Sequence, residues 1–147
     1  MRIPRLAVAP LTLSMLLLAS LAIAGATLAG GRPFTTQLLG ANEVPVSGDP
    51  DGSGSARVTL NPGTGQVCYS YTVSNVGPLM AGHIHEAPAG SPGPVVVTLA
   101  PTSATGGSGC VAADRELIKD ILKNPSDYYV NLHNMEFPGG AVRGQLR

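Results

Sequence analysis

The chain has 147 residues, a length typical of a single domain, and its nine basic residues balance its nine acidic residues. Only 12% of the residues are charged, and no segment concentrates lysine or arginine. This distribution argues against nucleic acid or an anionic membrane surface as the main partner.

Residues 1–29 have the features of a secretory signal peptide. Arg2 and Arg5 give a basic start, residues 6–31 carry no charge, and small residues end the segment. The uncharged stretch also reaches the roughly 20 residues that span a bilayer, so an uncleaved anchor is the alternative, and the only expected route to a membrane. Either way, residues 30–147 are expected outside the cytoplasm: secreted, periplasmic or at the cell surface. Without Arg2 and Arg5, seven basic residues face nine acidic ones, a net charge of −2.

Most of the remaining chain alternates between apolar and polar residues, as half-buried strands do. Ala56, Val58 and Leu60 share one face of a strand, and a Pro-Gly turn leads to the next, which predicts a hairpin. Gly- and Pro-rich segments separate the strands, and residues 101–109 have the composition of a loop. About seven short strands are expected, at residues 34–40, 55–61, 67–75, 80–87, 94–100, 128–134 and 141–147. This pattern predicts an all-β fold, an antiparallel sandwich or barrel.

One short helix is expected before the last two strands. Asp114 is a typical N-cap residue, and Pro125 ends the helix. The apolar positions between them form one stripe at helical spacing: Leu117, Ile118, Ile121 and Leu122. We expect this stripe to pack over one end of the sheet.

The two cysteines, Cys68 and Cys110, allow a single intramolecular pairing. An even number of cysteines in an exported chain indicates a disulfide, and two free thiols are the alternative. Their spacing does not suit a metal site of the Cys-x-x-Cys type.

Three sequence blocks resemble the CHRD domain, named for its occurrence in chordin. They are "LLGANEVPV", "AGHIHEAPAGSPGPVVVTL" and "YYVNLHNMEFPGGAVRGQLR", and the resemblance covers the chain from about residue 34 to its end. It implies an exported all-β domain without a defined activity. Growth-factor binding is not implied, because the cysteine-rich modules associated with it in chordin have no counterpart here.

The three histidines are the strongest candidates for a functional site. His83 and His85 are two apart on a predicted strand and share a face, and His133 lies on the polar face of another. If those strands are neighbours, the imidazoles converge and suit one Cu or Zn ion. Glu136, shortly after His133, is a potential fourth ligand, as is water. The alternative is a structural polar cluster in which the histidines hydrogen-bond nearby loops.

A short similarity links "GHIH" to the Gly-x-His-x-His motif of Cu/Zn superoxide dismutase. Three histidines are too few for that dinuclear site, so dismutase activity is not implied. Arg143 is a candidate for binding an anion or for an ion pair with Glu43 or Glu136, which at an exposed site contributes about 0–1 kcal/mol.

No nucleophile elbow and no carboxylate pair of the glycosidase type occurs in the sequence. The favoured function is therefore a non-enzymatic binding or interaction module with a three-His metal site, whose partner is a metal ion or an extracytoplasmic molecule. The alternative is a copper- or zinc-dependent redox enzyme.

Overall fold

The computed structural model describes residues 30–101 and 103–147, so the predicted leader lies outside the described residues. Within these described residues, eight strands, one α-helix and two short 3-10 helices follow one another. In chain order they are β1 (Arg32–Leu39), η1 (Gly40–Asn42), β2 (Ser53–Asn61), β3 (Gln66–Ser74), β4 (Leu79–Glu86), β5 (Val95–Leu99), β6 (Gly106–Ala112), α1 (Arg115–Lys123), η2 (Pro125–Asp127), β7 (Tyr128–Asn134) and β8 (Val142–Gln145).

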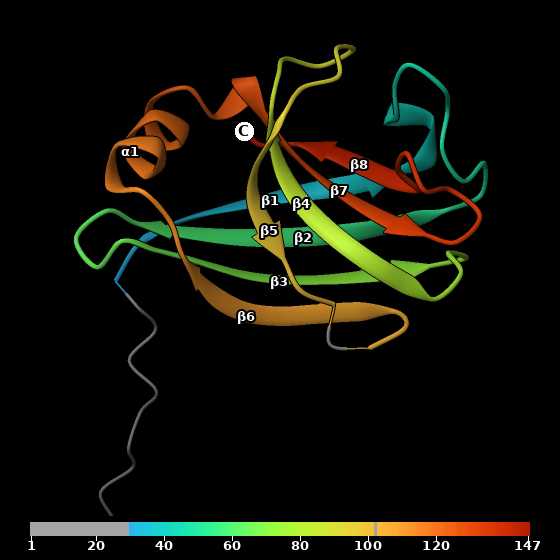
Figure 1. The fold of residues 1–147 in the computed structure, drawn as a ribbon, viewed down its shortest axis with the longest axis horizontal. Coiled ribbons are helices and arrows are strands. Elements are labelled where there is room, and N and C mark those ends of the chain that lie inside the picture. The colour runs from blue at the N-terminus through green and yellow to red at the C-terminus, as the bar shows by residue number, and fades with distance from the viewer. Residues whose placement is uncertain (1–29, 102) are drawn as a thin grey trace, which may run out of the picture.

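The strands form one antiparallel sheet in the order β5-β4-β7-β8-β1-β2-β3-β6. The sheet curls until its edge strands, β5 and β6, approach each other, so that it is nearly closed into a barrel (Figure 1). The predicted fold class, an antiparallel sandwich or barrel with a helix before the last strands, is confirmed.

The inner face of the sheet supplies the core. Alternate residues of each strand point inward, and the fully buried ones include Leu60, Val67 and Ile84. Helix α1 adds Ile118 and Ile121, both fully buried, and contacts β2 and β3 at one end of the barrel (Figure 1). This is the packing expected for its apolar stripe.

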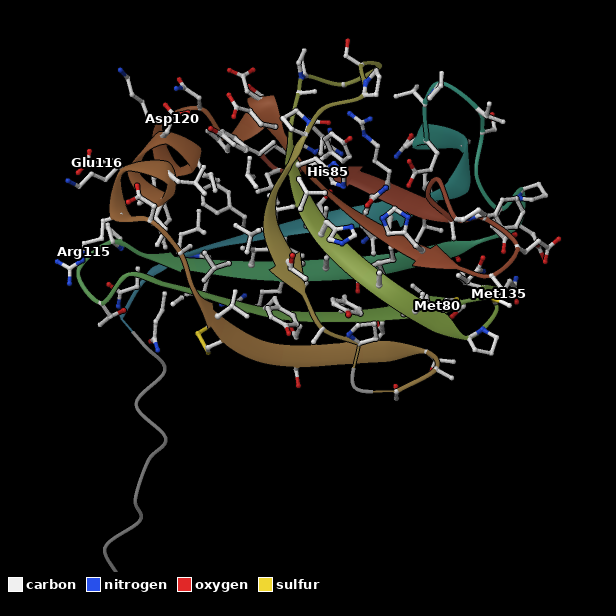
Figure 2. The ribbon with its side chains drawn as sticks, viewed as in Figure 1. Met80, His85, Arg115, Glu116, Asp120 and Met135 are labelled. Atoms are coloured by element: carbon white, nitrogen blue, oxygen red, sulfur yellow. A yellow bond between two sulfur atoms is a disulfide. The ribbon has the colours of Figure 1, made fainter. Side chains whose placement is uncertain are left out.

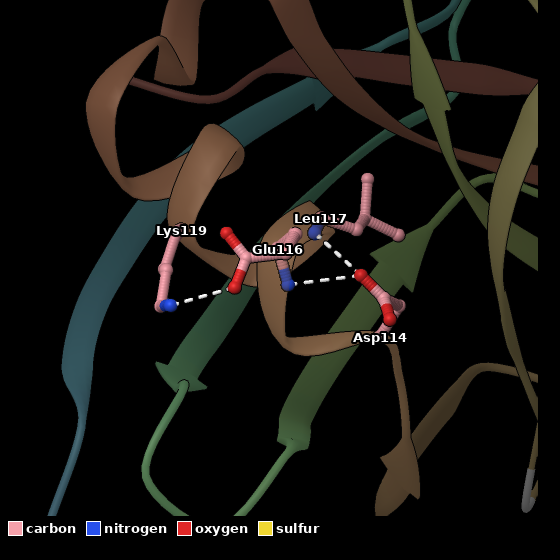
Figure 3. Close-up of polar contacts among 4 residues, drawn as sticks. All are labelled: Asp114, Glu116, Leu117 and Lys119. Atoms are coloured by element: carbon pink, nitrogen blue, oxygen red, sulfur yellow. Dashed lines mark hydrogen bonds and ion pairs between the residues drawn. The ribbon is translucent and has the colours of Figure 1, made fainter.

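Helix α1 begins as predicted. The backbone N–H groups of Glu116 and Leu117 donate to Oδ1 of Asp114, at 2.9 and 3.1 Å (Figure 3). One turn on, Lys119 pairs with Glu116 at 2.7 Å. The side-chain cap satisfies two of the four N–H groups that a helix start leaves without partners.

The interpretation of residues 101–109 as a loop was wrong over its second half, because β6 begins at Gly106 and pairs with β3. Glycine weakens a strand in isolation, but here it makes room for aromatic side chains. A Cβ atom at Gly107 would lie 2.6 Å from the Tyr71 hydroxyl, and one at Gly109 would lie 3.1 Å from the Tyr69 hydroxyl.

The predicted disulfide is present and links β6 to β3. Cys68 and Cys110 lie directly opposite each other in the β3–β6 register, and their sulfur atoms are bonded. Within residues 30–147, position 102 apart, no helix is long and apolar enough to cross a membrane.

Candidate metal centre

The outer face of β4, β7 and β8 carries the polar side chains that sequence reasoning singled out. Ile84 of β4 and Val130 of β7 are fully buried in the core, so His83, His85 and His133 point to the other side of the sheet. Because β4 and β7 are hydrogen-bonded neighbours, the condition on which the predicted cluster depended is met.

The three imidazoles converge. Nδ1 of His83 lies 3.0 Å from Nε2 of His133, and one ring nitrogen from each of the three histidines lies within 4.8 Å of the others. The ring centroids of His83 and His85 are 5.5 Å apart. All three side chains are half-buried, so the cluster is shielded from bulk water but reachable from the surface. His85 is labelled on β4 in Figure 2.

Two backbone carbonyls orient His85 and His133. Nδ1 of His85 donates to Gly93 O at 2.8 Å, and Nδ1 of His133 donates to Pro138 O at 3.0 Å. Since a carbonyl only accepts, both Nδ1 atoms carry a proton, and Nε2 is the nitrogen of each ring that faces the other histidines. Nε2 of His133 accepts from His83, whereas the buried Nε2 of His85 has no partner among the described residues. Metal-ligating histidines commonly show this arrangement, with the second nitrogen held by a carbonyl.

Burial favours the uncharged forms of His83 and His133. Loss of hydration lowers the pKa of His83 to about 4, and the neighbouring His133 and His85 lower it further. Burial also lowers the pKa of His133, against the opposing effect of its hydrogen bond to Pro138. A neutral imidazole is the form that binds metal ions.

Tyr129 lies between the cluster and the next strand, β8. Its ring stacks on His85 with centroids 4.8 Å apart and planes within 8° of each other. Arg143 of β8 lies with its Cζ 3.4 Å from the Tyr129 ring centroid. Because β4 and β8 flank β7, these two contacts support Tyr129 from both sides.

Of the two roles expected for Arg143, the structure does not contain the ion pair. In the part of the chain that the structure describes, Arg143 forms no ion pair with Glu43 or Glu136. It is 2% exposed and donates to Ser91 O at 2.9 Å and to Pro88 O at 3.1 Å. The loop between β4 and β5 folds back over the outer face, so its carbonyls accept hydrogen bonds from the guanidinium where the ion pair was expected.

The same loop reaches the histidines. Gly93 O accepts from His85, and Gly93 N donates to the Tyr129 hydroxyl at 3.3 Å. Gln145 binds the other end of the loop through Ala87 O at 2.8 Å. The predicted ligand His85 is therefore held by its own strand and by the loop that follows it.

Glu43 is a buried carboxyl that sequence reasoning did not place in the site. It is 5% exposed and accepts from Asn131 Nδ2 at 3.3 Å. Burial raises its pKa to about 7, and the Asn131 hydrogen bond and the charge of Arg143 oppose this rise. A Cβ atom at Gly140 would lie 2.5 Å from the carboxyl carbon, so the close approach requires glycine.

Glu136 does not belong to the cluster. Its side chain is exposed, and the group of potential metal ligands found within the described residues contains only the three histidines. Beside His83 and His133 lies a pocket of about 260 Å³, which Met80 and Met135 also line. His83 and His133 therefore border a pocket, whereas His85 does not line it.

A family model described as the CHRD domain matches residues 34–146. The match begins within β1, extends past the end of β8 and includes all three histidines and both cysteines. No curated protein and no solved structure matches the chain.

Proposed function

The chain belongs to the CHRD domain family, and from this premise we propose that it is an exported, non-enzymatic binding module that holds one copper or zinc ion. His83, His85 and His133 are the ligands. The family supports a binding module, while the predicted leader and the disulfide support export.

The observation that carries the metal site is the convergence of three imidazoles, two of which are oriented by backbone carbonyls. Zn–N bonds of about 2.0–2.1 Å place two nitrogens of a tetrahedral site about 3.4 Å apart. One pair is already at 3.0 Å and all three lie within 4.8 Å, so small side-chain rotations bring them onto one ion. The unpartnered Nε2 of His85 gains a partner in the same step.

The proton between His83 and His133 is the one that must move. In the structure, Nδ1 of His83 donates it to Nε2 of His133. For both atoms to bind an ion, His83 has to carry its proton on its other ring nitrogen. The outer hydrogen bonds of His85 and His133 stay as they are.

A copper- or zinc-dependent redox enzyme is the second candidate function. The observation that favours it is the pocket beside His83 and His133, which would leave a fourth coordination position open to a small molecule. Turnover that disappears with the metal would support this candidate over the binding module.

Metal content tests the proposal. The full chain is incubated with Cu or Zn, desalted and analysed by elemental mass spectrometry. About one equivalent is expected in the wild type, and a loss is expected in both His133→Ala and His85→Gln. Glu116→Gln, on the exposed face of α1, is the control that should retain metal. Failure of the wild type to retain either metal at neutral pH would overturn the proposal and favour a structural polar cluster.

A further inference from the structure

Both methionines in the described part of the chain lie at the opening of the histidine cluster. Met80 and Met135 line the same pocket as His83 and His133. Their side chains are 60% and 83% exposed, which is unusual for large apolar groups. Figure 2 shows the two labelled methionines at the same end of the molecule.

A β-bulge places Met80 at this opening, and a turn after β7 places Met135 there. The β4–β7 register pairs Leu79 with Asn134 and Ala81 with His133, so Met80 is the extra residue of a β-bulge. Bulges often redirect a side chain beside a functional site. Met135 follows β7 directly, in a loop that turns through the 2.7 Å hydrogen bond from Phe137 N to Asn134 Oδ1.

Thioether sulfur is a soft ligand, and the Cu(I) ion is the biological metal that it suits best. Zinc prefers imidazole, thiolate and carboxylate, and gains little from methionine. No thiol competes for the metal, because both cysteines of the chain are in the disulfide.

We propose that the metal taken by this site is Cu(I), and that the thioethers of Met80 and Met135 bind it on the pocket side of the three-imidazole cluster. This inference rests on the proposed function and adds the identity of the metal and two ligand side chains. The methionines would then be exposed because they capture the ion at the surface.

Affinities for Cu(I) and Zn(II) are measured separately on the full chain, by competition with a chromophoric chelator. The Cu(I) series is run without oxygen and with ascorbate as reductant. The test variant is Met80→Leu/Met135→Leu, which keeps the apolar volume and removes both sulfurs. The control is Val46→Leu, at an exposed apolar position that does not line this pocket.

The double variant should lose at least about tenfold in Cu(I) affinity, with Zn(II) affinity within about twofold of wild type. X-ray absorption of the Cu(I) form should show a sulfur scatterer in the wild type and none in the double variant. Unchanged Cu(I) affinity in the double variant would overturn this inference, and Zn(II) binding that depends on His133 would leave the proposed function standing. Failure of the wild type to bind either metal would instead overturn the proposed function.

Discussion

His83 and His133 meet diagonally across two strands, not as a directly paired couple. The register sets His83 opposite Asn131 and His133 opposite Ala81, yet Nδ1 of His83 and Nε2 of His133 are 3.0 Å apart. Diagonal neighbours on a sheet face are within reach of long side chains. This hydrogen bond requires that Nε2 of His133 carries no proton, because a proton there would face the N–H group of His83.

The metal-free protein should therefore lose stability in acid. The pKa of His83 is about 4 in the folded state against about 6.5 in the unfolded chain, so between these pH values the unfolded chain binds a proton that the folded protein does not. The free energy of unfolding should decrease as pH falls through that window. Urea unfolding at several pH values checks this, and His83→Gln should flatten the dependence. Parallel pH profiles for wild type and variant would contradict the assignment.

Glu43 should produce a pH dependence of opposite sign. Its pKa is raised to about 7 from an ordinary value of 4.5, so the folded protein binds the extra proton between these values. Stability from this group is complete below pH 4.5 and is lost as pH rises through 7. The free energy of unfolding is measured at pH 5 and at pH 8 for the wild type and for Glu43→Gln. The decrease between the two pH values should be smaller in the variant by up to about 3 kcal/mol. Glu136→Gln, at an exposed position, should leave the profile unchanged.

Replacement of Arg143 by lysine should destabilise the protein. Its guanidinium donates to two carbonyls of the β4–β5 loop and covers the Tyr129 ring, and an ammonium group cannot reproduce that planar geometry. Arg143→Lys should lower the free energy of unfolding by about 2–4 kcal/mol, as expected when buried hydrogen-bonding groups lose their partners. Chemical denaturation measures the loss. The exposed Arg57→Lys is the control, and an equal effect of both substitutions would argue against the role of Arg143.

Gly93 should be required for the loop to reach His85. A Cβ atom at this position would lie 1.9 Å from the backbone oxygen of Glu86, so alanine would displace the loop. Gly93→Ala should cost about 2–3 kcal/mol of stability and weaken metal binding, because Gly93 O orients His85. Thermal unfolding and metal titration measure the two effects. Gly139→Ala, where a Cβ atom meets nothing within 4 Å, should change neither.

The elements with a strong local pattern could be predicted from the sequence. Strand alternation placed Ile84 inward and its two histidine neighbours outward, and the Asp114 cap set the start of α1. The one cysteine pairing open to the chain is the pairing that the structure contains. The shared face of His83, His85 and His133 followed from period-two geometry once β4 and β7 were neighbours.

The remainder depends on contacts that no local pattern contains. Gly107 lies in a strand because it pairs with Tyr71 of β3, and the Tyr71 ring occupies the space that a Cβ atom at position 107 would need. Arg143 is buried because a loop more than 50 residues earlier in the chain covers it, as its hydrogen bonds to Pro88 and Ser91 show. Glu43 is buried through Asn131, which is 88 residues away. Long-range packing of this kind overrides the polarity of a single residue.

The backbone of β4 and β7 acts as a partition between two independent sets of side chains. Ile84, Val130 and Leu132 contact the interior, while the three imidazoles lie on the other side of the same hydrogen-bonded backbone. An exchange of any histidine for another polar residue leaves the interior contacts in place. The chemistry of the histidine positions is therefore separated from the packing of the core, and the same barrel interior is compatible with a different set of polar side chains at these positions.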